Sequence, residues 1–266
     1  MPGHNDPRNS HSDQTLQINF KEALNRVSQH PAMSYPDAAA PSSTIARTTE
    51  TSSDASSMPK PPSLTLILAA TPSLGIGKGG TLPWPQLKKE MGYFARVTKR
   101  VSSPSSAANG TSKVNAVLMG RKTWDSIPAK FRPLKDRLNI VITRNAEDFE
   151  KSLGGKSEVE GPLVATGIVD ALSRLENKPE VDRIYVIGGA SIYQTALELP
   201  QTKHVLLTNI RKEYECDTFF PVNLEESTVW RKASKEELET FTGEKVEDAG
   251  IEEQGVKFEF CLFERQ

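Results

Sequence analysis

From residue 63 onward, short apolar runs rich in β-branched residues alternate with stretches whose apolar residues recur at helical spacing. The segments that predict strands are 64–70, 114–119, 138–143, 163–165, 184–187 and 205–208, and helices are expected near 86–98, 168–176 and 190–199. Apolar and charged residues alternate over 256–263, which predicts a final strand with one wetter face. The pattern indicates an α/β fold built on a mainly parallel sheet with helices against it.

The first 62 residues differ from this pattern. They hold 15 Ser or Thr and 8 of the 18 Pro with only scattered apolar residues, which predicts a disordered extension ahead of a domain at 63–266. Apolar residues at 16, 20, 24 and 27 have helical spacing, but we prefer a floppy tail to a partner-binding helix because short isolated helices are marginal in water. Segments 102–112, 150–161 and 231–255 are expected to be surface loops or insertions.

Composition excludes several classes of protein. The longest strongly apolar stretch has seven residues, too few to cross a bilayer, and the N-terminus lacks a signal-peptide pattern. Two cysteines form neither a disulfide framework nor a CxxC site, so we expect a reducing compartment: the cytoplasm, or also mitochondria or the nucleus. A net charge of -1 gives no reason to expect nucleic acid or an anionic membrane as a partner.

Histidine is too scarce in the folded part for several common kinds of site. Three of the four His lie in the first 62 residues, which leaves His204, most simply an ordinary strand residue. A Ser/His/Asp or Cys/His centre, or a His-based metal site, would therefore have almost no histidines from which to form, and we expect no metal.

A glycine-rich segment follows the first predicted strand. Gly75, Gly77 and Gly80 match G-x-G-x-x-G, but no helix opens at once and no acid lies about twenty residues on, which contradicts a dinucleotide-binding fingerprint. Prolines on both sides of Trp84 instead predict a shaped loop that can close over a ligand. The simpler alternative is a mobile surface hairpin, for which a Trp between two prolines is a poor choice.

The helix after this loop carries an acid in its apolar face. On a helical wheel Glu90 falls within the stripe formed by Leu87, Met91, Phe94 and Val97, whereas Tyr93 falls on the opposite, polar arc. Burying a carboxylate is costly unless a partner pairs with it, and this face offers no cation. A ligand with two N–H donors, such as an amidine-like heterocycle edge, would satisfy Glu90; a Glu that bonds backbone near the helix start is an equal alternative.

Two strand-to-helix junctions and one strand end have the features of a phosphate site. One junction runs through Gly120 into the basic residues Arg121 and Lys122, another runs through the diglycine 188–189, and a third strand ends at 143–144 in Thr and Arg. Free N–H groups at a helix start bind phosphate, and basic side chains bind an extra one. Together these segments favour a dinucleotide that carries an additional phosphate.

Five segments together resemble eukaryotic dihydrofolate reductases, and most of all the fungal members. In chain order they read GIGKGGTLPWPQLKKEMGYFARVT, VLMGRKTWDSIP, RPLKDRLNIVITR, IYVIGGASIYQTAL and ECDTFFP. The resemblance covers about residues 63–266. It implies an eight-stranded, mainly parallel sheet flanked by helices with an antiparallel C-terminal strand. It also implies NADPH-dependent reduction of 7,8-dihydrofolate to tetrahydrofolate for one-carbon metabolism, inhibition by antifolates such as methotrexate, and a monomer.

The resemblance also assigns roles on the substrate side. Glu90 would bond the amino-pyrimidine edge of the pterin with support from Thr208, and Arg137 would pair with the α-carboxylate of the glutamate tail. Trp84 and Leu82 would belong to the loop that closes over the nicotinamide and holds a water, the expected last carrier of the proton. The slot around the pterin and benzoyl rings would be formed by Ile67, Met91, Phe94 and Ile127.

On the cofactor side the resemblance implies NADPH contacts at Ala69, Ile76, Gly77, Gly120, Arg121, Lys122, Thr123, Thr143, Arg144, Ile187, Gly188, Gly189, Ala190, Ser191, Ile192 and Tyr193. It also implies a cis peptide between Gly188 and Gly189. One position departs from the vertebrate pattern, because Thr166 stands where those members have an Arg that holds the 2′-phosphate. Preference for NADPH over NADH would then depend on Arg121, Lys122, Thr143 and Arg144.

Two other functions remain open on the sequence alone. A pyrimidine reductase of riboflavin synthesis would share the α/β sheet and NADPH, but it would leave Glu90, Trp84 and the Arg137 segment unexplained. A folate-binding or scaffold protein without turnover is the non-enzymatic alternative, and ligand affinity without catalysis would support it.

Overall fold

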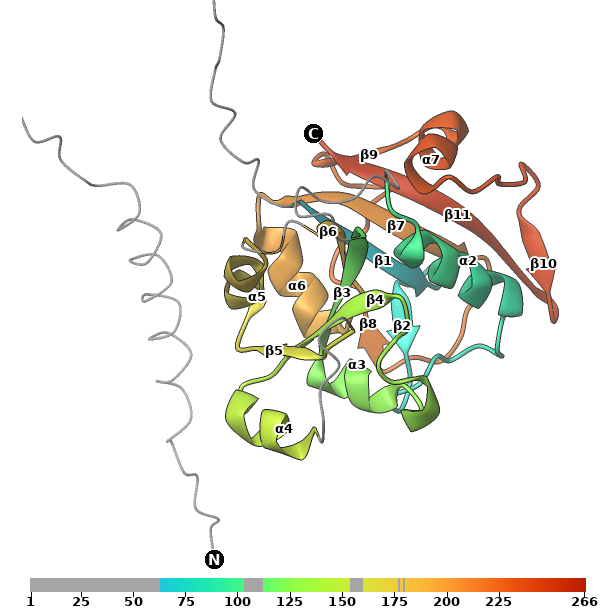
Figure 1. The fold of residues 1–266 in the computed structure, drawn as a ribbon. Coiled ribbons are helices and arrows are strands. Elements are labelled where there is room, and N and C mark those ends of the chain that lie inside the picture. The colour runs from blue at the N-terminus through green and yellow to red at the C-terminus, as the bar shows by residue number, and fades with distance from the viewer. Residues whose placement is uncertain (1–62, 103–111, 154–159, 177, 179) are drawn as a thin grey trace, which may run out of the picture. The chain divides into compact units, whose positions relative to one another are not determined.

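The computed structural model describes residues 63–102, 112–153, 160–176, 178 and 180–266 (Figure 1). The disordered extension and the helical pattern expected within residues 1–62 lie outside the described residues, as do residues 103–111 and 154–159 of the insertions expected at 102–112 and 150–161. The loop prediction is wrong at 150–152, because these residues form the end of a helix that runs to Ser152.

One mixed sheet dominates the described chain, with its strands in the order β10-β11-β7-β1-β6-β3-β4-β5 and β9 paired to β11. Parallel pairing joins β7, β1, β6, β3, β4 and β5, whereas β11 is antiparallel to β7, β9 and β10. The predicted mainly parallel sheet with an antiparallel C-terminal strand is therefore confirmed: eight strands form the main order, and β9 is a ninth strand beside β11. The strands are β1 Leu64–Ala70, β3 Val114–Gly120, β4 Arg137–Ile142, β5 Leu163–Ala165, β6 Val181–Val186, β7 Thr202–Ile210, β9 Trp230–Lys232, β10 Ile251–Glu253 and β11 Val256–Arg265.

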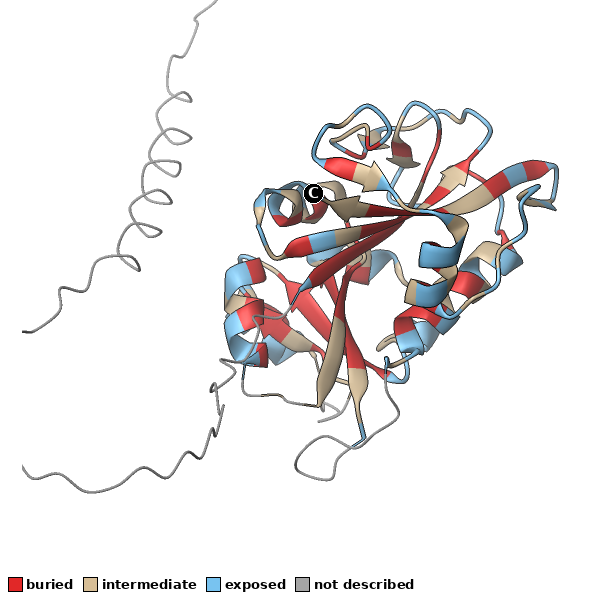
Figure 2. Cartoon of the chain, turned by 90° about the horizontal axis from the view of Figure 1, so that it is seen from above, coloured by how far each residue is buried: buried red, intermediate tan, exposed pale blue. Residues whose placement is uncertain are grey.

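Helices cover both faces of the sheet because successive residues of each strand point to opposite sides. Leu64, Leu66 and Leu68 of β1 pack with α5 and α6, while Ile67 packs on the opposite face with α2 and α7. Figure 2 shows buried residues concentrated along the central strands. The helices are α2 Lys88–Lys99, α3 Arg121–Ser126, α4 Ala146–Ser152, α5 Ile168–Leu175, α6 Ala190–Glu198 and α7 Lys235–Thr242, with a 3-10 turn η1 at Ala129–Phe131.

The prediction that 231–255 is a surface loop is wrong. This stretch contains part of β9, all of α7, which begins with a capping box between Ser234 and Glu237, and β10. The stretch is rich in charged residues, which is typical of surface loops, but many of these charges form ion pairs within the fold. Glu244, for example, bonds both Arg96 and Arg100 of the α2 region. Charge density alone therefore did not distinguish a loop from elements that dock on the sheet.

Parallel pairing brings the carboxyl ends of six strands to one edge of the sheet. β1 ends at Ala70, β3 at Gly120, β4 at Ile142 and β6 at Val186. Ligands of open α/β sheets bind outside this edge. A small second sheet, β2 Gly75–Gly77 with β8 Thr218–Phe219, anchors the glycine-rich loop close to the end of β1.

Candidate active site

The first turn of α2 places Glu90 beside the end of β7. Thr208 donates its hydroxyl hydrogen to Oε1 of Glu90 at 3.3 Å. Desolvation raises the pKa of the Glu90 carboxyl from 4.5 to about 7, and the hydrogen bond from Thr208 opposes that rise. No cation forms an ion pair with Glu90 in the part of the chain that the structure describes. The site therefore holds a desolvated acid whose strong acceptor capacity the protein uses only in part.

The buried face of α2 differs from the predicted stripe. Tyr93, Val97 and Thr98 are buried, whereas Met91 is 45% exposed, so the prediction that Tyr93 faces solvent and Met91 lies in the apolar stripe is wrong. The reason is tertiary: Tyr93 stacks on Phe260 of β11 with the ring centroids 3.6 Å apart. Glu90 still lies on the buried side, as the desolvation of its carboxyl shows.

Apolar residues predicted for the substrate slot come together only in part. Ile67, Phe94 and Ile127 belong to one cluster on the α2 face of the sheet. Met91 lies outside this cluster at the surface. The backbone carbonyl of Ile67 accepts a hydrogen bond of 2.9 Å from the hydroxyl of Tyr193. Burial, followed by the nearby Glu90 charge, raises the pKa of Tyr193, so its hydroxyl stays protonated beside the acid.

The loop before α2 is anchored by Trp84. Its side chain is 5% exposed and packs with Leu87 and with the edge of Tyr214, whereas Leu82 on the same loop is 52% exposed. Nε1 of Trp84 is buried, yet among the described residues it finds no acceptor. The indole N–H is thus an unused donor inside the loop.

Arg137 is a buried cation at the start of β4. Its side chain donates to Thr98 Oγ1 at 2.8 Å and to the carbonyl of Lys135 at 3.0 Å, and it lies over the ring of Phe94. Burial lowers the pKa of its guanidinium. Asp136 and Glu160 oppose this shift through their charges, but no salt bridge to Arg137 is formed within the described part of the chain. The arrangement therefore suits a carboxylate that a ligand supplies.

Glycines form the turn between β6 and α6. The peptide between Gly188 and Gly189 is cis, as the resemblance implies, and Gly188 has a φ of 119°. A Cβ on either glycine would lie 3.4 Å from Oγ1 of Thr123, and the N–H of Gly120 donates to the Gly188 carbonyl at 2.8 Å. The β3–α3 and β6–α6 junctions are therefore in direct contact, with the start of α6 open to a phosphate.

Cations around these junctions differ in their availability. Arg121 bonds Asp125 at 2.7 Å and lies over Phe149, so its charge is already used. Lys122 and Arg144 are exposed and have no carboxylate partner among the residues described. Thr166 is held by Asp170, which also pairs with Arg174.

Sequence reasoning missed one residue next to the site, Glu253. From β10 its carboxylate accepts hydrogen bonds from the backbone N–H groups of Lys88 and Lys89. The available signal was indirect: α2 begins after Leu87, which has no side-chain oxygen to cap the helix.

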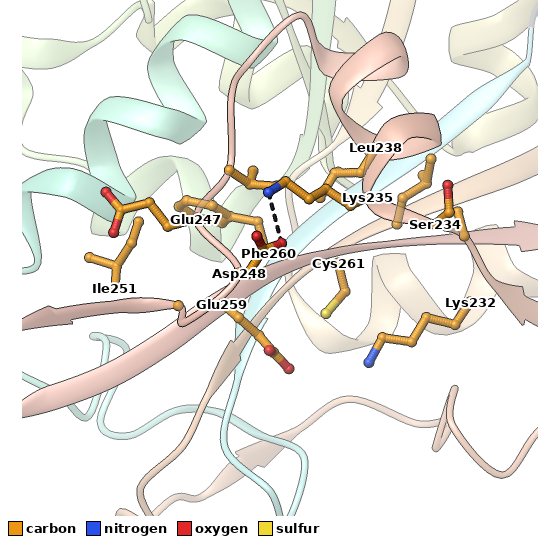
Figure 3. Close-up of a pocket in the computed structure, with 14 residues that line it drawn as sticks. Lys232, Ser234, Lys235, Leu238, Glu247, Asp248, Ile251, Glu259, Phe260 and Cys261 are labelled. Carbon is orange, nitrogen blue, oxygen red and sulfur yellow. Dashed lines mark hydrogen bonds and ion pairs between the residues drawn. The ribbon is translucent and has the colours of Figure 1, made fainter.

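A cavity of about 170 Å³ lies elsewhere, between α7, the segment 246–251 and β11 (Figure 3). Lys235 and Asp248 form an ion pair beside it at 2.7 Å. None of the residues predicted for substrate or cofactor lines this cavity. The chemistry described above is thus located at the strand ends and not in this cavity.

In the described chain, no helix is both long and apolar enough to traverse a bilayer.

Comparisons with known proteins agree with this geometry. A sequence model of the dihydrofolate reductase family matches residues 63–249. The chain is 42% identical to a dihydrofolate reductase of Pneumocystis carinii over 209 residues, which cover 76% of this chain and 97% of that protein. It is 37% identical to the Candida albicans protein of the same name, covering 79% of this chain and all of the relative.

Two further similarities extend the comparison. A dihydrofolate reductase of Schizosaccharomyces pombe is 41% identical, and the match spans 47% of that protein's length. The solved structure of Schistosoma mansoni dihydrofolate reductase superposes with a TM-score of 0.60 at 30% identity and covers 78% of this chain and 100% of that one. The chain therefore belongs to the dihydrofolate reductase family.

Proposed function

We propose that this oxidoreductase of the CH–NH group reduces 7,8-dihydrofolate to 5,6,7,8-tetrahydrofolate, with NADPH bound along the carboxyl ends of the parallel strands. The observation that carries this assignment is the desolvated Glu90 carboxylate beside Thr208, with no cationic partner among the described residues. A pterin offers the two neighbouring N–H donors that such a carboxylate accepts, and a pterin fits the apolar cluster beside it.

Glu90 holds and polarises the pterin. Its two oxygens accept from the amino-pyrimidine edge, while the Thr208 hydroxyl fixes the carboxylate from β7. This edge lies far from the ring nitrogen that receives the proton, so Glu90 orients the substrate and does not deliver the proton directly. Trp84 offers the buried Nε1–H that can hold a water for the last transfer.

Arg137 selects the tail of the substrate. Its buried guanidinium, fixed by Thr98 and lying over Phe94, pairs with the α-carboxylate of the glutamate moiety. Phe94, Ile67 and Ile127 contact the rings between the two charged ends. Antifolates that present the same donor edge and the same carboxylate are expected to compete for this site.

The strand ends fit NADPH. Glycines at 120, 188 and 189 let a pyrophosphate approach backbone that any Cβ would obstruct, with Thr123 Oγ1 next to both 188 and 189. Lys122 and Arg144 are free to bind the 2′-phosphate, and Thr143 directly precedes Arg144 at the end of β4. When bound, NADPH supplies the hydride; the protein positions the two rings and excludes water through the loop of Leu82 and Trp84.

The test is the loss of reduced-nicotinamide absorbance when the protein and NADPH receive dihydrofolate, with and without methotrexate. We expect methotrexate-sensitive oxidation, and we expect Glu90→Gln to lose at least about 100-fold in turnover while it still binds NADPH. The control Glu226→Gln removes an exposed carboxylate on another segment and should behave as the unchanged protein does.

Three outcomes would contradict the assignment. Near-normal turnover of Glu90→Gln would overturn the role of this residue. Tight methotrexate binding without oxidation would favour a folate-binding protein that lacks turnover. Oxidation with a pyrimidine of riboflavin synthesis, but not with dihydrofolate, would favour the related-fold reductase.

A monomer active in a reducing compartment completes the proposal, and sedimentation of the purified protein tests its oligomeric state.

A further inference from the structure

The hairpin of β10 and β11 reaches the start of the helix that carries Glu90. Oε1 of Glu253 accepts from the N–H of Lys88 at 3.0 Å, and Oε2 accepts from the N–H of Lys89 at 2.9 Å. Both carboxylate oxygens of one residue are thus directed at two successive backbone donors. Lys88 and Lys89 lie 165 and 164 positions before Glu253 in the chain.

These donors need a partner that α2 itself does not supply. The first hydrogen bond of the helix runs from the N–H of Met91 to the carbonyl of Leu87 at 3.0 Å. The N–H groups of the residues before Met91 therefore have no carbonyl within the helix. Leu87 at the N-cap has no side chain that can accept. Glu253 performs the capping function from a different element.

The position of Glu253 is itself fixed by the hairpin. It pairs with Val256 across β10 and β11, and the intervening Gln254 and Gly255 have φ values of 50° and 70°, as in a tight two-residue hairpin turn. The Gln254 amide also donates to the carbonyl of Gln86 at 2.6 Å.

Apolar packing joins the same two segments. Leu87, Val256 and Phe258 are all buried in one cluster, together with Trp84. The start of α2 and the hairpin therefore form a continuous packed unit, and the carboxylate of Glu253 is presented by a rigid support.

We propose that Glu253 is a positioning residue for the reaction: by capping the first turn of α2 it holds Glu90 against Thr208, and so holds the pterin. This inference rests on the proposed function of Glu90. Glu90 directly follows Lys89 in the same turn, and its 3.3 Å contact with Thr208 is long enough that a small movement of the turn would break it.

Loss of the cap should affect this turn and leave the rest of α2 in place. The other end of the helix is held separately: Arg100 donates to the carbonyl of Thr242 at 2.7 Å, and Glu244 pairs with Arg96 and Arg100, both at 2.7 Å. Tyr93 also stacks on Phe260. Glu253→Ala is therefore expected to fray only the turn that contains Glu90.

The experiment compares Glu253→Ala and Glu253→Gln with the control Glu252→Gln. Glu252 is exposed on the same hairpin and lies 3.7 Å from its partner Lys257. Removing the Glu252 carboxylate changes the net charge as much as removing that of Glu253, but it does not affect α2. We expect Glu253→Ala to raise the KM for dihydrofolate and the Kd for methotrexate about tenfold, equivalent to about 1.4 kcal/mol. The KM for NADPH should stay within about twofold, and Glu253→Gln, which keeps one acceptor, should lie between.

Equal losses for NADPH and dihydrofolate would overturn the proposal, as would no loss for either, because a merely structural role does not separate the two ligands. The variant Glu244→Gln supplies a second comparison: it weakens the far end of α2 and should lower thermal stability without the selective loss of folate affinity. A selective loss of the same size in Glu244→Gln would also count against Glu253.

A double-mutant cycle separates this inference from the proposed function. If Glu253 acts through Glu90, adding Glu253→Ala to Glu90→Gln should change methotrexate affinity much less than Glu253→Ala does alone. Additive losses would overturn the inference while leaving Glu90 in its role. Unchanged methotrexate affinity in Glu90→Gln alone would overturn the proposed function, and the inference with it.

Discussion

Single cations at the strand ends differ in whether the protein already uses their charge. Arg121, which directly follows β3, is bound to Asp125. Arg144 follows β4 at the open edge, is exposed, and has no carboxylate partner among the described residues. An extra phosphate on the cofactor would thus meet Arg144 without first breaking an internal ion pair.

Arg144→Leu is therefore expected to raise the KM for NADPH about tenfold or more and to change the KM for NADH by less than about twofold, since a hydrogen bond to a charged group contributes about 1.5–3 kcal/mol. Steady-state oxidation with each cofactor measures both values. Lys203→Leu is the matched control, because Lys203 is an exposed cation near the amino end of β7, at the opposite edge of the sheet. Equal effects on the two cofactors would contradict the assignment.

The β6–α6 junction acts at the scale of an element, since it directs the start of a nine-residue helix toward the strand ends. Gly189 is its N-cap and accepts from the N–H groups of Ile192 and Tyr193, which starts the helix at Ala190. Gly188 has a φ of 119°, a region in which residues with a Cβ are strained. The junction thus depends on glycine for its geometry as well as for ligand approach.

Gly188→Ala should therefore lower the free energy of unfolding by about 1–3 kcal/mol and weaken NADPH binding more than methotrexate binding. Chemical denaturation and ligand titration test the two effects. Gly167→Ala is a suitable comparison: Gly167 is also an N-cap, but its φ of -167° is ordinary extended backbone and nothing lies within 4 Å of an added Cβ. A Gly188→Ala protein as stable as Gly167→Ala would show that the junction tolerates a side chain.

Stability of the whole molecule is linked to pH through the same acid that serves the site. The pKa of Glu90 is about 7 in the folded protein against an ordinary value of 4.5. Because the pKa is higher in the folded protein, the unfolded chain releases this proton at a lower pH than the folded protein does. The stabilisation linked to the protonated carboxyl is thus fully present below pH 4.5 and is lost as the pH rises through about 7.

Glu90→Gln removes this titration. Between pH 5.5 and 8 we expect the variant to gain on the order of 1–2 kcal/mol in free energy of unfolding relative to the unchanged protein, at about 1.4 kcal/mol for each pKa unit. Denaturation of both proteins without ligand at the two pH values measures the difference. A constant difference across this range would mean that Glu90 is not desolvated in solution.

The pattern of the chain by itself located the six parallel strands of the sheet and pointed to candidate site residues, whereas it missed β9 and β10. Apolar runs located β1, β3, β4, β5, β6 and β7 because burial within a parallel sheet leaves a local signature. The diglycine at 188–189 and the acid at 90 also stand out in the sequence, because each is unusual for the element in which it lies. The resemblance to a family then supplied roles that spacing could not.

Only the tertiary structure decided which side of α2 is buried and what fixes its start. Tyr93, and not Met91, is buried because Phe260 of a distant strand stacks on it. The cap on the first turn comes from Glu253, in a charged stretch that looked like a loop. Both facts depend on contacts between segments more than 160 residues apart, and side-chain periodicity within one helix carries no information about such contacts.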